Sequence, residues 1–348
     1  MSPQTGPDRS YYDGAAEYDT EAVRFFDVAH EGAQLRAVAQ AGDLLAGLRG
    51  AAPRSVVVLA TDAVSEAAAE CAVALSDYGR APVMVTRTLP EFVGALDVVV
   101  VVGDAPDAET VTRQVAVAAN RGADVVLAGP SGGPVVEDAP RGAVPLPAPP
   151  TADGASPLRT LAAVLFVCAE LSGTPVEGGD LADAVDEELR QLSPERDTTV
   201  NLARQLREYS DGARVLHTGY SPAGAAVARL IAALWSARGI PSGFVGREDL
   251  AAALEQSGDT AGSSGVSGTD DLFYDPFVDG PPAHVPVKTI VWAQRDPHML
   301  GARAEYVDDS YGGGDVAGDA GDAGGIDLSG ALRLIVRGLA ATAMQVPH

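Results

Sequence analysis

Residues 97–110 read DVVVVVGDAPDAET. The five valines make a short run without a polar side chain, which is typical of a strand buried on both faces of a parallel sheet. Gly103 ends the run, and a stretch with helical spacing begins near Glu109. The segment therefore predicts a strand, a turn and a helix. In parallel α/β proteins such a turn lies at the carboxyl edge of the sheet, where ligands bind.

Similar apolar runs, separated by segments with helical periodicity, occur on both sides of this strand. The runs expected to form strands are SVVVLA (55–60), PVMV (82–85), ADVVLA (123–128), AVPL (143–146) and VKTIVWA (287–293). The segments expected to form helices include 21–48, 108–121, 158–171, 181–192 and 328–344. This alternation predicts an α/β fold in which helices cover both faces of parallel sheets.

The chain also resembles itself. Residues 55–85 and 214–245 each contain a strand, a turn of small residues, an alanine-rich helix, and a glycine and a proline before the next strand. Gly79 and Gly239 hold equivalent places, which indicates two structural copies. The expected organisation is an N-terminal tail with helices (1–50), a first domain (51–175) and a second domain (176–348).

Two segments of the second domain, 257–271 and 311–325, have the composition of flexible linkers. The second of them is rich in aspartate and glycine. Its spacing fits no EF-hand, so a surface loop is favoured over a calcium site.

The composition excludes several classes of partner. A formal charge of −24 repels nucleic acids and anionic membranes. The apolar runs fall short of the roughly 18 residues that span a bilayer, and the N-terminus has no signal-peptide features, so we expect a soluble, cytoplasmic protein. Cys71 and Cys168 are expected to be buried and reduced. No cluster has metal-ligand spacing, so neither a metal nor a cofactor is expected.

Together these features resemble a protein with two sugar isomerase (SIS) domains, each a flavodoxin-like, three-layer parallel sheet. More narrowly, the chain is similar to the bifunctional phosphoglucose/phosphomannose isomerase family. The use of arginine, with Lys288 as the single lysine, indicates a divergent actinobacterial branch. The segments that carry the resemblance are RTLPEFVGALDVVVVVGDAPDAETVTRQVAVAANRGADVVLAG (87–129), PSGGPVVEDA (130–139), residues 201–206 leading into HTGYSPAGAAVARL (217–230), and VKTIVWAQRD (287–296). The resemblance implies a sugar phosphate ligand and a homodimer with the cleft at the subunit boundary.

The phosphate-binding turn of the family is altered in this chain. The family has Ser-x-Ser-Gly-x-Thr-Glu-Glu-Thr after its third strand. Here Val102 and Asp104 take the serine places, and Asp107 takes the threonine place. Glu109 and Thr110 persist. A carboxylate can accept the amide hydrogens of a helix start, so we expect Asp104 or Asp107 to cap the helix that follows, with ligand contact as the alternative.

The turn after the first strand also differs from the family's sequence by gaining an acidic residue. The family's Gly-x-Gly-Gly-Ser is replaced by ATDAV (60–64), although Thr61 and Ser65 keep hydroxyl groups nearby. The expected cleft therefore faces three acids. A second negative charge at about 4 Å from one of them would cost roughly 1 to 4 kcal/mol, depending on the local dielectric constant.

The recognised acid/base pair of the family does not carry over. Ser236 and Ala237 stand where its glutamate is expected, and no histidine follows Glu248. If catalysis survives, Glu248 is the candidate base and His217, at the end of a strand, is the candidate acid. The structural alternatives are a solvated glutamate near a helix start and a hydrogen-bonded core histidine.

The favoured interpretation is an SIS-domain protein that binds a sugar phosphate or another carbohydrate derivative with degenerate catalytic residues. The alternative is an active phosphoglucose/phosphomannose isomerase with relocated acid and base. A nucleotide-binding Rossmann enzyme is disfavoured because no G-x-G-x-x-G follows the strands. The candidate ligand contacts are Thr61, Ser65, Asp104, Asp107, Thr110, Ser131, Ser221, Arg238 and Lys288.

Overall fold

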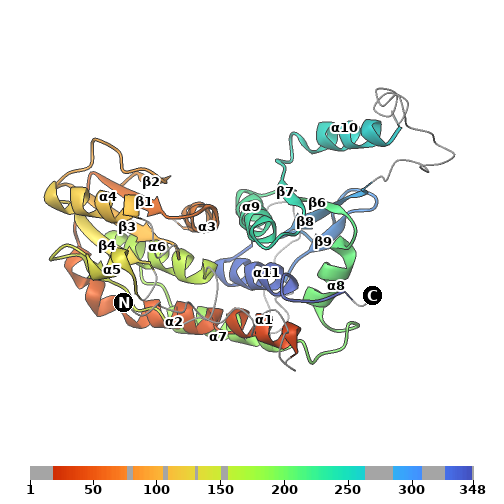
Figure 1. The fold of residues 1–348 in the computed structure, drawn as a ribbon, viewed down its shortest axis with the longest axis horizontal. Helices are drawn as coiled ribbons and strands as arrows, with labels where there is room; N and C mark the ends of the chain where they lie inside the picture. The colour runs from red at the N-terminus through yellow and green to blue at the C-terminus, as the bar shows by residue number, and fades with distance from the viewer. Residues whose placement is uncertain are drawn as a thin grey trace, which may run out of the picture.

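The computed structural model describes residues 19–76, 81–104, 109–129, 132–149, 156–262 (backbone only for 258–262), 285–307 and 326–346. They form two parallel sheets joined by helices (Figure 1). The strands are β1 (Ser55–Ala60), β2 (Val83–Thr86), β3 (Asp97–Val102), β4 (Asp124–Ala128), β5 (Val144–Pro145), β6 (Arg214–Gly219), β7 (Ser242–Phe244), β8 (Val287–Trp292) and β9 (Arg303–Glu305). The helices are α1 (Thr20–Val28), α2 (Glu31–Gln40), the 3-10 helix η2 (Gly42–Leu48), α3 (Ala63–Leu75), α4 (Glu109–Asn120), α5 (Pro134–Glu137), α6 (Pro157–Ser172), α7 (Gly178–Gln191), α8 (Leu202–Ser210), α9 (Pro222–Ala237), α10 (Leu250–Gly262) and α11 (Leu328–Ala341).

The first sheet has the order β2-β1-β3-β4-β5, with β3 at its centre. Every residue of β3 is buried. Val98, Val100 and Val102 share a core with α3 and α6, whereas Val99 and Val101 pack with α4 on the opposite face. Burying one valine side chain contributes about 1.5 to 3 kcal/mol relative to exposure. This explains why a strand of consecutive valines forms the middle of the sheet.

The second sheet repeats the plan of the first, in the order β7-β6-β8-β9. β6 pairs with β7 and β8 in the same parallel sense in which β1 pairs with β2 and β3. The last residues of the central pairs also correspond, because Ala60 lies opposite Val102 and Gly219 lies opposite Trp292. The prediction of two parallel-sheet α/β units is confirmed.

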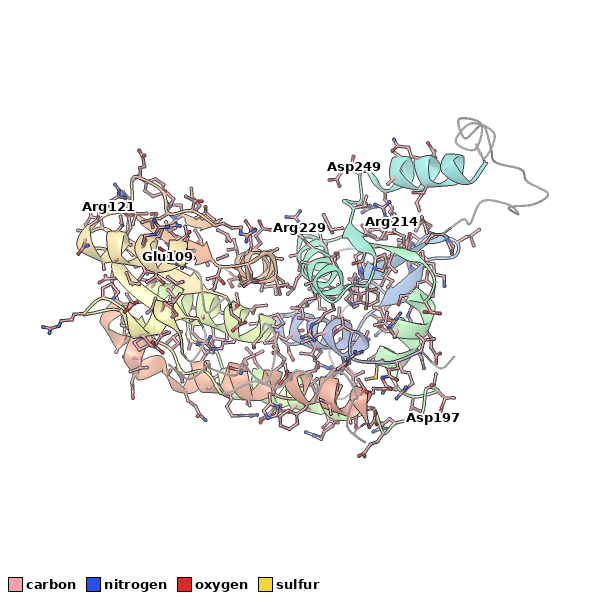
Figure 2. All side chains as sticks on the ribbon, in the orientation of Figure 1. Glu109, Arg121, Asp197, Arg214, Arg229 and Asp249 are labelled. Carbon is pink, nitrogen blue, oxygen red and sulfur yellow. The ribbon has the colours of Figure 1, made fainter. Side chains whose placement is uncertain are left out.

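Helices connect the two sheets through one continuous apolar core. α3 packs against α6 and α9, and α9 packs against α11. α2 and α7 run together along one side, and α7 also contacts α11 (Figure 1). An ion pair of 3.3 Å joins Arg229 of α9 to Glu70 of α3. Arg229 lies on the side of α9 that faces the first sheet (Figure 2).

A buried ion network holds α7, α11 and β9 together. Glu188 of α7 pairs with Arg333 and Arg337 of α11 at 3.1 and 2.7 Å. Arg337 also pairs with Glu305 of β9 at 2.9 Å, and its side chain is 4% exposed. Each buried charge has a partner, so the network tolerates burial, whereas removing one partner would leave the other uncompensated.

Some elements differ from the sequence prediction. A flexible insertion is predicted at 257–271, yet α10 continues to Gly262, so the start of that segment is helical. The rest of this insertion and the insertion 311–325 lie outside the described residues. Cys71 and Cys168 are free and buried, as expected. None of the described helices combines the length and the hydrophobicity that a membrane crossing requires.

The contact between β6 and α9 yields a stability prediction. A Cβ on Gly219 would lie 2.2 Å from the backbone carbon of Gly224, and backbone atoms cannot give way without displacing the helix. We expect Gly219→Ala to lower the free energy of unfolding by about 1 to 3 kcal/mol in urea denaturation. Gly243→Ala is the control, because its Cβ would meet nothing within 4 Å. Equal stability of the two variants would contradict this account.

Candidate functional site

Hydroxyl and carboxylate groups crowd the turn after β3. Gly103 has a φ of 115°. A Cβ there would lie 2.1 Å from Thr61 Oγ1, 2.6 Å from Asp62 Oδ2 and 2.7 Å from Ser65 Oγ. Both the backbone conformation and the lack of space therefore require glycine. The turns after β1 and β3 meet at the carboxyl edge of the sheet, which brings Thr61 and Ser65 to the candidate site.

Asp62 occupies the start of α3. Its Oδ1 accepts a hydrogen bond from the Ser65 amide at 2.8 Å, and Ser65 Oγ accepts one from the Asp62 amide at 3.2 Å. This reciprocal pair is a capping box. Asp62 Oδ2 accepts bonds from Thr61 Oγ1 at 2.9 Å and from the Asp104 amide at 3.4 Å. Asp62 thus satisfies donors of both turns.

Two further acids converge on the start of α6. The amide of Ser156, the N-cap residue, donates to Asp104 Oδ2 at 2.8 Å. The amide of Leu158 donates to Glu31 Oε2 at 2.9 Å. Glu31 comes from α2 and is 2% exposed. Glu31, Asp62 and Asp104 are called the acid cluster below.

The first turn of α6 has no main-chain donor left for an external anion. Pro157 has no amide hydrogen. The Arg159 amide donates to Ser156 Oγ, and the Thr160 amide donates to the Ser156 carbonyl. Together with the two bonds to the acid cluster, these contacts satisfy all the donors that a helix start normally leaves open. The protein's own side chains fill an anion-binding position.

Asp104 differs from the sequence prediction in the helix that it serves. The sequence assigns Asp104 or Asp107 to cap α4, the helix that follows the turn. The Asp104 carboxylate instead binds the amide of Ser156 at the start of α6. Local sequence could not show this, because the two residues are 52 positions apart. Asp107 lies outside the described residues.

Burial shifts the protonation of the acid cluster. Burial raises the pKa of Glu31 to about 8, and the charge of Asp104 adds to this, against hydrogen bonds from Leu158 and Ser156. Burial also raises the pKa of Asp104 to about 6, with a contribution from the charge of Asp62. At pH 7, therefore, Glu31 holds its proton while most Asp104 side chains are ionised.

The nearby arginines are engaged or peripheral. Arg159, which is 2% exposed, donates to the backbone carbonyls of Ala128, Gly129, Leu146 and Pro147 and so ties the ends of β4 and β5 together. Burial has the largest effect on the pKa of Glu31 and raises it, whereas the charge of Arg238 lowers this pKa. Arg238 therefore lies within electrostatic reach of the acid cluster. Arg238 is the exposed C-cap residue of α9. It therefore approaches the site from the second domain.

His217 does not line this edge. Its ring is 0% exposed and contacts the rings of Trp235 and Trp292, with centroid distances of 4.8 and 6.0 Å. Trp292 Nε1 donates to His217 Nδ1 at 3.0 Å, and burial lowers the pKa of His217 to about 3. The expectation that His217 stands beside a cleft is therefore corrected. Its role as an acid stays a prediction, one that would require the two indole rings to move.

Within the described ranges, no hydrogen bond or ion pair joins the remaining candidates to the acid cluster. Lys288 is at the amino end of β8, where its Nζ donates to a backbone carbonyl at 2.7 Å, so it lies at the edge opposite to the carboxyl ends. Glu248 is exposed before α10, and Thr110 is exposed in the first turn of α4. Ser221 caps α9 in the second domain. Ser131 lies outside the described residues.

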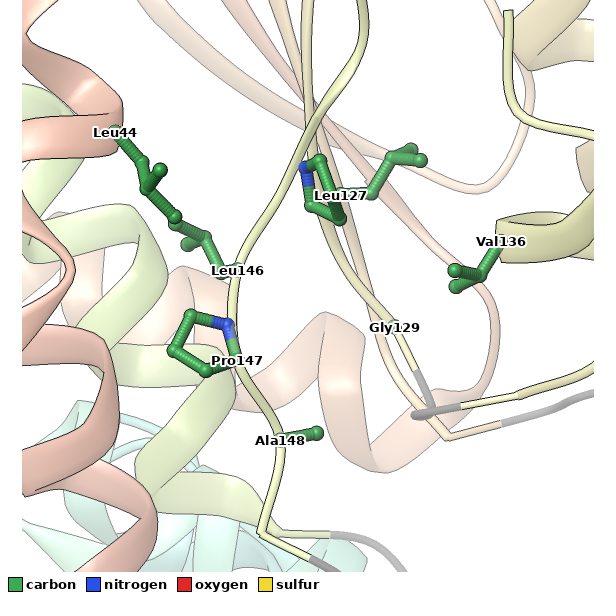
Figure 3. A pocket seen from close by; sticks show the side chains of 8 residues that line it. Leu44, Leu127, Gly129, Val136, Leu146, Pro147 and Ala148 are labelled. Carbon is green, nitrogen blue, oxygen red and sulfur yellow. The ribbon is translucent and has the colours of Figure 1, made fainter.

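An apolar pocket of about 320 Å³ lies beside the turn after β4 (Figure 3). Leu44 of η2, Val136 of α5 and the ends of β4 and β5 line it. Gly129 connects the pocket to the site, because a Cβ there would lie 3.7 Å from the Gly103 carbonyl oxygen. Among the described residues no charged side chain lines the pocket, so polar recognition would come from the acid cluster. Within the described ranges, no group of His, Cys, Asp and Glu could hold a metal ion.

No family model matches the chain, and no curated protein matches it. Solved structures do match. A candidate phosphosugar isomerase from Silicibacter pomeroyi has a TM-score of 0.58 at 14% identity, covering 92% of this chain and 96% of its own. This chain has the SIS-type sugar isomerase fold. Tagatose-6-phosphate ketose/aldose isomerase from Escherichia coli (TM-score 0.54, 9% identity, 92% of this chain and 91% of its own) and glucosamine-6-phosphate deaminase from Thermotoga maritima (0.55, 10%, 92% of each chain) share the fold.

The raised pKa of Glu31 predicts a pH dependence of stability. The pKa is about 8 in the fold against 4.5 for an unperturbed glutamate, so the folded chain holds a proton that the unfolded chain releases in this window. The stabilisation of the fold by this proton is complete below pH 4.5. It falls as the pH rises and is lost above about pH 8. Glu31→Gln should flatten the fall in the free energy of unfolding, by up to about 1.4 kcal/mol per pH unit, in urea titrations.

Glu109→Gln, which removes an exposed acid from α4, is the matched control and should keep the wild-type profile. If Glu31→Gln and wild type lose stability in parallel from pH 5 to 9, then Glu31 does not hold a proton in the fold.

Proposed function

We propose that the chain binds a carbohydrate derivative at the carboxyl edge of the first sheet and does not isomerise it. The structural neighbours named above are described as phosphosugar or amino-sugar phosphate enzymes, which supports the ligand class. The acid cluster supports the second half of the proposal. Its carboxyl groups accept hydrogen bonds from the main-chain amides through which this edge would hold a phosphoryl group.

The observation that carries the proposal is the saturated start of α6. Its amides donate to Asp104 and Glu31, so an incoming phosphoryl group would find no donor there. It would also face the carboxylates of Asp62 and Asp104, at a cost of about 1 to 4 kcal/mol for charges about 4 Å apart. A sugar hydroxyl, in contrast, can donate to a carboxylate oxygen. The edge therefore favours the hydroxyl groups of a carbohydrate derivative and holds a phosphate only weakly.

The described acids do not assemble a catalytic pair. Moving a proton between neighbouring sugar carbons needs a base within hydrogen-bond reach of the substrate. Glu31 is buried and protonated at neutral pH. No hydrogen bond joins the exposed Glu248 to the buried His217 in the part of the chain that the structure describes. The alternative of an active isomerase that uses these two residues has no supporting observation of its own.

The finer identification rests on the sequence segments described above. On that basis we propose a place near the bifunctional phosphoglucose/phosphomannose isomerase family, in an actinobacterial branch. We also propose a cytoplasmic homodimer with the binding edge near the subunit boundary, and domain boundaries at 51–175 and 176–348.

A turnover assay tests the absence of catalysis. Purified protein incubated with fructose 6-phosphate should form neither glucose 6-phosphate nor mannose 6-phosphate, because the carboxylates at the edge, Asp62 and Asp104, are held by the amides of Ser65 and Ser156, and Glu31 keeps its proton. Nuclear magnetic resonance of the mixture measures all three sugars. Conversion that Glu248→Gln abolishes would contradict the proposal and establish the isomerase.

A double substitution tests the electrostatic argument. Asp62→Ser with Asp104→Asn removes two charges, while serine still caps α3 and asparagine still accepts from Ser156. We expect the affinity for fructose 6-phosphate to rise about tenfold or more, because a relief of about 1.4 kcal/mol corresponds to tenfold. Isothermal titration calorimetry gives the dissociation constants.

The matched control is Asp43→Asn with Asp124→Asn, which removes the same charge from exposed positions outside the cluster. An equal gain in this control would mean that overall charge, and not the acid cluster, limits phosphate binding.

A further inference from the structure

The two structural copies differ in charge at equivalent turns. Asp62 and Ser221 both stand two residues after the first strand of their sheet and cap the helix that follows. Asp104 and Gln294 both stand two residues after the central partner strand. Both acids of the first copy are therefore neutral hydrogen-bonding residues in the second. At these two positions the second copy therefore has no carboxylate.

The start of α9 keeps an uncompensated positive end. Ser221 Oγ accepts from the Gly224 amide at 3.0 Å, and the first turn contains no acidic residue. α3, in contrast, has Asp62 at its N-cap and Glu66 in its first turn. The partial positive charge of a helix start favours an anion, and here no side-chain carboxylate of that turn opposes it.

A cluster of polar and cationic side chains lies beside this turn. The guanidinium of Arg247 sits 4.9 Å from the centre of the Tyr220 ring, and the ring of His298 is stacked on Tyr220 at 6.0 Å. The Tyr220 hydroxyl donates to the Pro297 carbonyl, which ties the β8–β9 loop to the turn after β6. Gln294 Nε2 lies 3.5 Å from His298 Nε2. The side chains of two loops are thus held together at the carboxyl edge of the second sheet.

The β8–β9 loop is strained at its first residue and near its middle. Ala293 has a φ of 59° and His298 has a φ of 50°, and these are the only non-glycine residues with positive φ in the described ranges. A left-handed backbone conformation is unfavourable for an alanine or a histidine. Such strain concentrates at ligand-binding sites. Here it fixes the loop in the form that places His298 against Tyr220.

Arg247 provides a positive charge at this edge. No carboxylate lies within ion-pair distance of Arg247 among the described residues. The acid nearest His298 is Asp296, whose carboxylate accepts from the His298 amide at 2.8 Å and lies 3.7 Å from His298 Nδ1. Asp296 thus places one carboxylate at this edge, hydrogen-bonded to the His298 backbone. Arg295 adds a further cation beside Tyr306, with its guanidinium 5.0 Å from that ring.

We propose that the turn after β6 and the β8–β9 loop form a second small-molecule site, which binds a phosphoryl group. Arg247 supplies the charge and a fork of N–H donors suited to phosphate oxygens. Ser221, Gln294 and His298 supply further donors from the turn after β6 and from the β8–β9 loop. The site is separate from the first-sheet edge and does not depend on what binds there.

Calorimetric titration of the full chain with inorganic phosphate, at constant ionic strength, tests this proposal. The wild type should bind phosphate with a dissociation constant of about 1 mM or tighter, and acetate more weakly. Arg247→Gln should weaken phosphate binding at least tenfold. Ser221→Asp should do the same while keeping α9 capped, because aspartate is as good an N-cap as serine. The histidine C–H resonance of His298, assigned with His298→Gln, should shift with phosphate in the wild type and in neither variant.

Two controls separate this site from general attraction and from the first-sheet edge. Arg214→Gln removes a cation from the amino end of β6 in the same sheet, where Figure 2 labels it, and should leave phosphate affinity unchanged. The Asp62→Ser, Asp104→Asn variant should keep the His298 shift. The proposal is overturned if the wild type does not bind phosphate, if Arg247→Gln and Ser221→Asp bind it as the wild type does, or if Arg214→Gln weakens it equally.

Discussion

The binding properties of the first sheet depend on the hydrogen bonds between the acid cluster and the start of α6. A helix start attracts anions through its free amides and its partial positive charge. Here Asp104 and Glu31 accept the bonds that an external phosphate would otherwise accept. The same bonds fasten α2 to α6 and the turn after β3 to α6. The first domain thus keeps the fold of phosphosugar isomerases, while its edge presents carboxylates in place of donors.

The second structural copy allows the acidic edge of the first sheet to be compared with an equivalent edge in the same chain. Both sheets have the same strand pairing at their centre, so their carboxyl edges can be compared residue by residue. Where the first edge has Asp62 and Asp104, the second has Ser221 and Gln294, with Arg247 nearby. The ligands that we propose for the two edges therefore differ, with hydroxyl groups at the first and a phosphoryl group at the second.

The sequence predicts the fold well because its strands are short apolar runs buried at every position. DVVVVV at 97–102 coincides with β3. The proximity of Thr61 and Asp104 also follows, because the ends of neighbouring parallel strands share one edge. Glu31 could not be found in this way, since it reaches α6 from another helix 127 residues away. The burial of His217 depends on two tryptophans from α9 and β8, so its position at a strand end was a misleading signal.

A crystal structure of the protein soaked in fructose 6-phosphate would test the central claim most directly. The account predicts electron density for the phosphoryl group at the carboxyl edge of the second sheet, against Arg247 and Ser221. It predicts none between Gly103 and the start of α6. A phosphoryl group seated on the amides of Ser156 and Leu158, with Asp104 and Glu31 displaced, would contradict it.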